Sequence, residues 1–242
     1  MYSPGIKKSP GCFDLWPGPG LSNHNPNLYI FISRLHNFRY LPTMYTLKYK
    51  EFSEALYQAL QPDPFYIRLL QSIPGDNEKR DALISYLDYS MYEAEKYGLL
   101  FIPGQHRYGA AVWSKPLNED IESEKSHEKK AFLKTNLGDG VLDAYVQMVD
   151  FMSAKLEDLI ATESWYLSIV GIKPEFQGKG LGAVLVNDVL QQTDKLGLPT
   201  YLETFTPRNI SFYNRLGYEM TASFLEPLTN ATYWVLVREA RS

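Results

Sequence analysis

A glycine-rich turn between an apolar run and a helical pattern constrains the fold of this chain more than any other stretch. The apolar run from Trp165 to Ile172 predicts a buried β-strand, which Pro174 ends. Gln177-Gly-Lys-Gly-Leu-Gly182 follows and leads into a helical pattern from Ala183 onward. Such a turn leaves several backbone N–H groups unpaired at the positive end of a helix dipole, where they can bind a pyrophosphate. The stretch therefore predicts a strand, a turn and a helix around a phosphate site.

The spacing of the glycines separates the candidate phosphate motifs. A P-loop needs Gly-Lys-Ser/Thr at the end of the turn, but here Gly180 follows Lys179. A dinucleotide fingerprint needs Gly-x-Gly-x-x-Gly, but the glycines here are Gly178, Gly180 and Gly182. The stretch resembles instead the pattern Gln/Arg-x-x-Gly-x-Gly/Ala, with which the GNAT superfamily of N-acetyltransferases binds the pyrophosphate of coenzyme A. The glycines alone also allow a tight strand-to-helix turn without a ligand.

Composition argues against several other classes of protein. The chain has 242 residues and a formal net charge of −4, which gives no sign of a nucleic-acid-binding surface. The single cysteine, Cys12, excludes an internal disulfide framework, and the four histidines lack metal-ligand spacing. No apolar run approaches the ~20 residues that span a bilayer. We therefore expect a cytoplasmic protein with no metal site, no nucleic-acid partner and no membrane partner.

The chain divides near residue 43. Residues 1–43 are rich in Pro, Gly and Asn and lack a sustained hydrophobic period, so we expect a poorly ordered N-terminal extension. Residues 44–242 are expected to form one folded domain, for which Met44 would serve as an alternative start. The extension is therefore either part of the working protein or an artefact of start-site choice.

Hydrophobic periods and turn residues predict the elements of this domain. We expect strands at 45–49, 99–102, 110–113, 165–172, 200–205, 218–225 and 232–238, and helices at 54–60, 64–72, 76–97, 141–160, 183–196 and 207–216. Ser53 and Thr206 are expected to cap helix N-termini, and Gly197 and Gly217 to end helices. We interpret the charged run 119–134 as a solvated helix face or a mobile connection. The apolar stripe of the 141–160 helix is interpreted as core, or at one edge as the wall of a substrate pocket. This order predicts an α/β (α+β layered) fold with a mixed central sheet flanked by helices.

The same order of elements resembles the GNAT fold over roughly residues 45–238. The motifs that carry the resemblance are similar to those of the branch containing puromycin N-acetyltransferase-like proteins. They are Trp165-Tyr-Leu, Gln177-Gly-Lys-Gly-Leu-Gly182, Leu198-Pro-Thr-Tyr-Leu-Glu-Thr204, Pro207-Arg-Asn-Ile-Ser-Phe-Tyr213 and Leu216-Gly-Tyr218. The resemblance implies acetyl-CoA as the acetyl donor. It implies little about the acceptor, because the N-terminal half, which would shape the acceptor pocket, matches only in outline.

The resemblance also implies which residues hold the donor. The backbone of 170–172 would pair with the pantetheine arm as an added strand, and one N–H there would polarise the thioester carbonyl. The amides of 178–183 would hold the pyrophosphate, with a charge from Lys179, and Asn209 would hydrogen-bond the pantetheine. The implied cofactor-binding positions are Val170, Gly171, Ile172, Gln177, Gly178, Lys179, Gly180, Leu181, Gly182, Ala183 and Asn209. From the residues alone, Lys179 also fits a solvated loop and Asn209 a local helix-start bond.

Two side chains are the catalytic candidates. Tyr213 holds the position of the general acid in the resemblance, since a phenol with a pKa near ~10 can protonate a leaving thiolate. The residues alone equally allow it to pack in the core beside Leu216. Glu203 is the leading general base, because desolvation on its strand face would raise its pKa. The alternatives are that Glu203 pairs with Arg208, that a water relay removes the proton, or that Glu163 is the base.

We therefore expect direct, single-step transfer of an acetyl group to an amine, since no cysteine near the signature offers a covalent route. The expected acceptor is a small-molecule amine. The alternatives are acetylation of a protein lysine or N-terminus, and a non-catalytic acyl-CoA-binding regulator of the same fold. A deep aromatic acceptor groove would favour a small molecule, whereas an open acidic groove would favour a peptide. The identity of the amine and the oligomeric state stay open.

Overall fold

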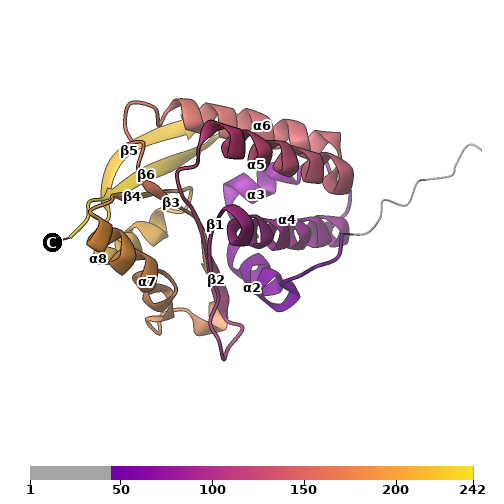
Figure 1. The fold of residues 1–242 in the computed structure, drawn as a ribbon. Coiled ribbons are helices and arrows are strands. Elements are labelled where there is room, and N and C mark those ends of the chain that lie inside the picture. The colour runs from indigo at the N-terminus through magenta and orange to yellow at the C-terminus, as the bar shows by residue number, and fades with distance from the viewer. Residues whose placement is uncertain (1–44, 242) are drawn as a thin grey trace, which may run out of the picture. The chain divides into compact units, whose positions relative to one another are not determined.

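The fold of residues 45–241, which are those that the computed structural model describes, is built on one six-stranded sheet (Figure 1). Its strands are β1 (Gly98–Phe101), β2 (Gly109–Ser114), β3 (Trp165–Ile172), β4 (Thr200–Thr204), β5 (Glu219–Glu226) and β6 (Ala231–Arg238). They lie in the order β1-β2-β3-β4-β6-β5, with β3 and β4 parallel and the other neighbours antiparallel. The predicted α/β fold with a mixed central sheet is confirmed. The extension expected at 1–43 lies outside the described residues.

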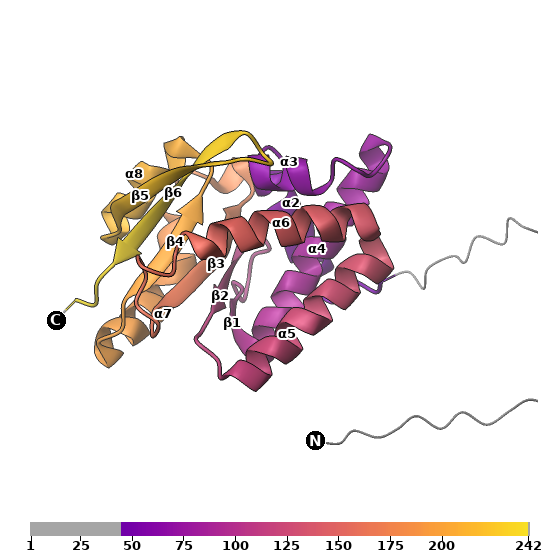
Figure 2. The same cartoon turned by 90° about the horizontal axis from the view of Figure 1, so that it is seen from above.

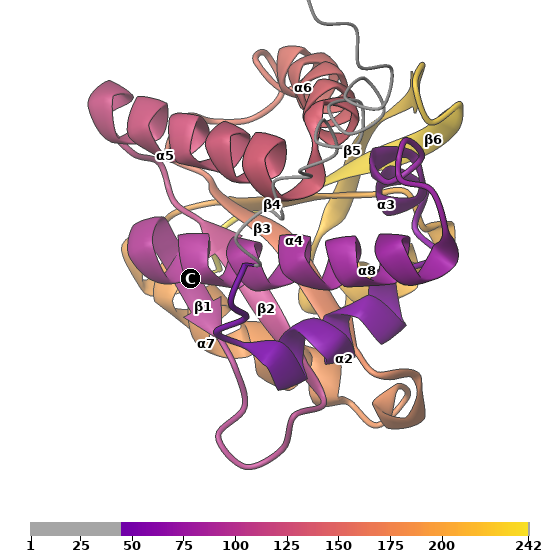
Figure 3. The ribbon, with the colours of Figure 1, turned by 90° about the vertical axis from the view of Figure 1, so that its right-hand side faces the viewer.

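Helices cover both faces of this sheet. They are α2 (Lys50–Leu60), α3 (Pro64–Leu69), α4 (Asp76–Tyr97), α5 (Glu119–Phe132), α6 (Asp139–Ala154), α7 (Leu181–Leu196) and α8 (Ile210–Leu216). A π-helical segment, η1 (Leu133–Leu137), and two short 3₁₀-helices, η2 (Pro174–Phe176) and η3 (Pro207–Asn209), complete them. Helices α2 and α4 lie on one face of the sheet and α7 on the other (Figure 1). Helices α5 and α6 run alongside α4 (Figures 2 and 3). Within residues 45–241, no helix is long and apolar enough to cross a membrane.

Two apolar cores hold the sheet between these helices. Leu56 of α2 and its neighbours fill the core on one face, and Leu185 of α7 belongs to the core on the other. Strand β3 contributes to both cores, through Ile169 on the first face and Leu167 on the second. Residues two apart on a regular strand face the same side, so this change of face marks an irregularity in β3.

The strand expected at 45–49 is wrong, and so is the cap expected at Ser53. The backbone N–H groups of Lys48 and Tyr49 donate to the buried carboxylate of Asp88 on α4, at 2.9 and 2.7 Å. Asp88 therefore satisfies donors that a strand would have paired in a ladder. Helix α2 begins before Ser53, whose hydroxyl donates to a carbonyl inside that helix. The local sequence gives no sign of this arrangement, because the acceptor lies on another helix.

Other boundaries differ in smaller ways. The helices expected at 64–72 and 141–160 are α3 and α6, which end earlier. Thr206 does not cap the following turn with its side chain; its hydroxyl donates to Asp63 Oδ2 at 3.2 Å. The charged run 119–134 forms α5 and the start of η1, and Lys129 within it is buried, so a wholly solvated face is wrong at that position.

Candidate active site

Strands β3 and β4 part from each other, and the candidate site lies at this opening. Their pairing is limited to Trp165 with Thr200 and Tyr166 with Tyr201. Farther along, residues 170–172 pair with β2 on one side only. The backbone donors and acceptors on the other edge face the opening. An edge of this kind can pair with an extended ligand as if the ligand were another strand.

A β-bulge in β3 accompanies the parting of the strands. Ile169 pairs with Val112 and Leu167 with Trp113, so Ser168 is the extra residue. Its hydroxyl donates to the carbonyl oxygen of Val112 at 3.1 Å. A bulge bends its strand and increases the local twist. The bulge therefore explains both the change of face in β3 and the separation from β4.

A cavity of about 470 Å³ extends from this opening along the glycine turn, and we call it the donor cavity. The predicted cofactor-binding residues that line it are Val170, Gly171, Ile172, Gln177, Gly178, Gly180, Leu181, Gly182 and Asn209. Two predicted residues do not line it. The ammonium of Lys179 lies 5.2 Å from the ring centroid of Phe176, and the N–H of Ala183 donates to the carbonyl of Gly180 at 3.2 Å.

The glycine turn is shaped to present backbone amides. Gly178 and Gly180 have φ angles of 74° and 77°, in the left-handed region that favours glycine. The side-chain Nε2 of Gln177 donates to the carbonyl oxygen of Ile172 at 2.9 Å and ties the turn to the end of β3. The N–H groups of Leu181 and Gly182, at the start of α7, have no intrahelical acceptors, so they can bind an anion. Arg208 and Arg215, which were not predicted as site residues, also line the cavity and add positive charge to its wall.

A second cavity, of about 790 Å³, lies between the strands β3 and β4 and the helices α3 to α6, and we call it the acceptor cavity. Its aromatic lining residues are Phe65, Tyr66, Tyr86, Tyr145, Tyr166, Tyr201, Phe205 and Tyr213. One edge of the α6 stripe, including Val149 and Met152, forms part of the wall. The two cavities share Leu60, Asp63, Val170, Asn209 and Tyr213, so they meet at these residues.

Glu203 lies in the acceptor cavity with one carboxylate oxygen engaged and the other without a partner. The hydroxyl of Tyr166 donates to Oε2 at 3.2 Å, while Oε1 is buried and has no hydrogen-bond partner among residues 45–241. The Tyr166 ring stacks on Tyr201 with centroids 4.7 Å apart. Burial raises the pKa of Glu203 to about 7, and the bond from Tyr166 opposes part of this rise. The expected alternative of an ion pair with Arg208 does not occur.

Tyr213 lies where the two cavities meet. It is buried and packs against Phe212 and Tyr218, as its apolar neighbours suggested. The same residue also lines both cavities, so packing and a role in the site are compatible. Burial raises its pKa above the usual value for tyrosine, so the phenol is protonated at neutral pH. Glu163, the weaker candidate base, is exposed and does not line either cavity.

Asp63 and Tyr166 are the main site residues that sequence reasoning missed. Asp63 Oδ1 accepts the N–H of Phe65, and Oδ2 accepts the hydroxyl of Thr206, so the carboxylate joins the start of α3 to the end of β4. Burial raises its pKa above the usual value. In the sequence, Asp63 is only the residue before the helix expected at 64–72. Tyr166 could have been predicted as a site residue, since it lies one residue from the start of the predicted strand that leads to the glycine turn.

Two cavities that meet at buried Tyr213 are an arrangement that suits an enzyme transferring a group from one substrate to another. A family model described as "Acetyltransferase (GNAT) family" matches residues 105–218. An uncharacterized N-acetyltransferase of Schizosaccharomyces pombe is 25% identical over 176 residues, covering 70% of each chain. Residues 105–218 therefore match the GNAT acetyltransferase family, and the chain is similar to a protein named as an N-acetyltransferase.

Solved structures share the fold at low sequence identity. The structure titled histone acetyltransferase HPA2 and related acetyltransferase, from Corynebacterium glutamicum, has a TM-score of 0.54 at 18% identity, covering 82% of this chain and 94% of the other. Arylalkylamine N-acetyltransferase 2 from Aedes aegypti has a TM-score of 0.52 at 14% identity, covering 80% and 94%. Proteins of this fold generally use acetyl-CoA as the donor.

Proposed function

We propose that this protein transfers the acetyl group of acetyl-CoA directly to the amine of a small molecule. The observation that carries the proposal is the junction of two cavities at Tyr213. One contains the glycine turn, and the other contains Glu203, a carboxylate with an unpaired buried oxygen. A donor and an acceptor that enter from the two cavities would meet at this junction.

The donor cavity fits the parts of coenzyme A in order. The turn at 178–182 offers backbone amides and left-handed glycines to the pyrophosphate. The open edge at 170–172 offers a strand-like partner to the pantetheine arm, and Asn209 lies opposite on η3. Acetyl-CoA supplies the acetyl group as a thioester. A backbone N–H on the open edge would stabilise the charge that develops on the thioester oxygen.

Glu203 and Tyr213 have the protonation states that the transfer needs. An alkyl ammonium must lose a proton before its nitrogen can attack, and a carboxylate with a pKa of about 7 accepts a proton efficiently near neutral pH. Tyr213 retains its proton and can donate it, or a hydrogen bond, to the leaving sulfur. Both groups line the acceptor cavity, and Tyr213 alone of the two also lines the donor cavity.

The lining of the acceptor cavity supports a small molecule over a peptide. Its volume of about 790 Å³ is within the ~300–1,000 Å³ typical of small-molecule sites. Aromatic rings line it, and α5 and α6 form one side of it. Two mosquito proteins with similar folds are titled as arylalkylamine N-acetyltransferases or as similar to one. The motifs similar to puromycin N-acetyltransferase-like proteins add puromycin to the candidate acceptors.

An acetyl-CoA turnover assay across a panel of amines tests the proposal, with release of free thiol as the readout. The panel contains arylalkylamines, alkylamines, puromycin and a lysine peptide. We expect thiol release with at least one small amine and none with the peptide. Turnover of the peptide alone would contradict the small-molecule acceptor. Binding of acetyl-CoA by calorimetry without thiol release on any amine would contradict the whole proposal.

A further inference from the structure

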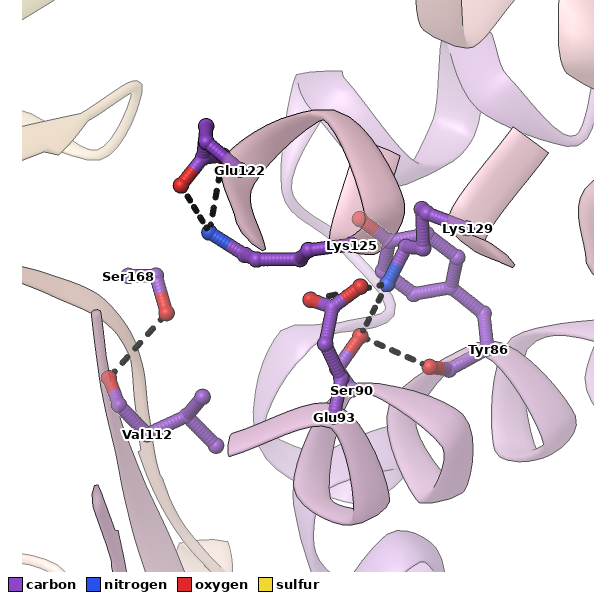
Figure 4. A network of polar contacts seen from close by, with 8 residues as sticks. All are labelled: Tyr86, Ser90, Glu93, Val112, Glu122, Lys125, Lys129 and Ser168. Carbon is purple, nitrogen blue, oxygen red and sulfur yellow. Dashed lines mark hydrogen bonds and ion pairs between the residues drawn. The ribbon is translucent and has the colours of Figure 1, made fainter. Parts of the chain in front are cut away.

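One wall of the acceptor cavity, formed by α4 and α5, is polar and has no part in the chemistry proposed above. Figure 4 shows this wall together with the bulged region of β3, and all eight residues drawn there line the cavity. The charged members of the wall drawn in Figure 4 are Glu93, Glu122, Lys125 and Lys129, and the exposed Lys130 of α5 also lines the cavity. Two of these charges are already matched, since Lys125 pairs with Glu122 at 3.2 Å. The other two, Glu93 and Lys129, lie 3.9 Å apart, which is within the range of an ion pair but too far for a hydrogen bond.

Lys129 is a buried cation with an incomplete set of acceptors. Its residue is 5% exposed, and its Nζ donates to the hydroxyl of Ser90 at 2.9 Å. The ammonium also lies 4.4 Å from the ring centroid of Tyr86 and 5.0 Å from that of Tyr89. The carboxylate oxygen that lies near it, Oε2 of Glu93, is 3.9 Å away. That distance is too long for a hydrogen bond, so an ammonium with three donors makes one hydrogen bond to the described residues.

Glu93 lacks a hydrogen-bond donor, just as Lys129 lacks acceptors. Its side chain is 17% exposed, and its Oε1 is buried without a hydrogen-bond partner in the part of the chain that the structure describes. A buried carboxylate oxygen is normally satisfied, and leaving it without a donor costs free energy. Lys129 therefore has unused hydrogen-bond donors, and Glu93 has an unused acceptor. The two side chains lie next to each other on the cavity wall (Figure 4).

The charge balance of the pair limits which ligand group fits. A second ammonium would pair with Glu93 but would be repelled by Lys129. A carboxylate would pair with Lys129 but would be repelled by Glu93. A neutral group that both donates and accepts can complete both side chains at once, and hydroxyl and carboxamide groups have this property. An alkyl end would leave both unsatisfied.

We propose that Glu93, Lys129 and Ser90 form a recognition subsite that selects amine acceptors carrying a neutral hydroxyl or carboxamide group remote from the reacting amine. This subsite deepens the proposed function and rests on it, since it needs the amine to bind in the acceptor cavity. Glu203 and Tyr213 would act on the amine, and the α4–α5 wall would hold the other end of the same molecule.

The test compares primary amines that share one linker and differ only at the far end. The ends are carboxamide, hydroxyl, methyl, ammonium and carboxylate, and kcat/KM is measured by thiol release over several linker lengths. We expect the carboxamide or hydroxyl amine to exceed the methyl amine about tenfold or more at the best length, because its end completes hydrogen bonds to charged groups. We expect the ammonium and carboxylate amines to fall below the neutral polar ones.

Two variants then assign that preference to the subsite. Glu93→Gln and Lys129→Met should each reduce the ratio of kcat/KM between the polar and methyl amines to near one. Acetyl-CoA binding by calorimetry reports whether each variant is folded. Glu128→Gln is the matched control, because Glu128 also pairs with a lysine between α4 and α5, Lys96 at 2.7 Å, but does not line the cavity. It should leave the ratio unchanged.

The outcomes separate the two proposals. Turnover of all five amines at similar rates, or a preference for the ammonium or carboxylate end, would overturn the subsite while leaving the proposed function intact. A preference for the polar ends that persists in folded Glu93→Gln would also overturn it. If a variant does not fold, the order of kcat/KM values for the five amines on the wild-type protein still tests the subsite. Absence of turnover with every small amine would overturn both proposals.

Discussion

Replacing Tyr166 by phenylalanine should move the pH dependence of acetyl transfer upward. The Tyr166 hydroxyl donates to Oε2 of Glu203 at 3.2 Å, and this bond stabilises the ionised carboxylate. A hydrogen bond to a charged group contributes about 1.5–3 kcal/mol. Because 3.2 Å is at the long end of the normal range, we take the lower value, which corresponds to a rise of about one unit in the pKa of Glu203.

The size of the effect on rate follows from the ionised fraction of Glu203. Its pKa is about 7 in the wild-type protein, so about half of the carboxylate is ionised at pH 7. A rise of one unit leaves roughly a tenth ionised at that pH. We therefore expect kcat/KM of the variant to be about fivefold lower than that of the wild-type protein at pH 7. The two kcat/KM values should converge near ~pH 9, where Glu203 is ionised in both proteins.

The assay is a pH profile of kcat/KM from pH 5.5 to 9.5 with one amine acceptor and thiol release as the readout. Tyr201→Phe is the matched control, since Tyr201 stacks on Tyr166 in the same cavity but makes no hydrogen bond to Glu203. We expect the acidic limb to move far less in the control. An acidic limb that does not move in Tyr166→Phe, or a rate that falls equally at every pH, would refute the assignment of that limb to Glu203.

Three further perturbations have expected outcomes. Tyr213→Phe should lower kcat by about 10²-fold or more with little change in acetyl-CoA affinity, measured by kinetics and calorimetry; an unaltered kcat would remove Tyr213 from the reaction. Gly180→Ala should weaken acetyl-CoA binding about tenfold or more, whereas Gly197→Ala, at the other end of α7 with a similar φ of 70°, should leave binding unchanged. Equal affinities in the two glycine variants would contradict the turn as the pyrophosphate site. Glu203→Gln should raise the melting temperature relative to wild type at pH 8 but not at pH 4. The folded pKa of about 7 exceeds the usual value of 4.5 for glutamate, so the wild-type protein loses stability as pH rises between these values, by up to about 3 kcal/mol. A stability difference that is independent of pH would contradict the raised pKa.

Local patterns predicted the parts of the fold whose causes are local. The strand at 165–172 and the glycine turn after it were predicted from an apolar run, a proline and three glycines, and the structure has both. Gly197 ends α7 in the left-handed conformation, as expected of a helix C-terminus. Glu203 was predicted to be desolvated on its strand face, and burial in the structure raises its pKa.

Features that depend on distant partners were not predictable in this way. The start of α2 depends on the carboxylate of Asp88, and the buried position of Lys129 depends on Ser90 and on the faces of Tyr86 and Tyr89. In the sequence, Lys129 is one cation in a charged run, and such runs usually form solvated faces. The polar wall of the acceptor cavity is therefore visible only after the chain has folded.

Burial has opposite uses at the two groups that handle protons. At Glu203 it raises the pKa to about 7, where a carboxylate is a useful base at neutral pH. At Tyr213 it raises the pKa further above that of a thiol, about 8.5. Full proton transfer from the phenol to a leaving thiolate is then uphill. Tyr213 would therefore act chiefly by donating a hydrogen bond to the sulfur as charge develops on it, and the proton taken up by Glu203 would reach the thiolate through solvent.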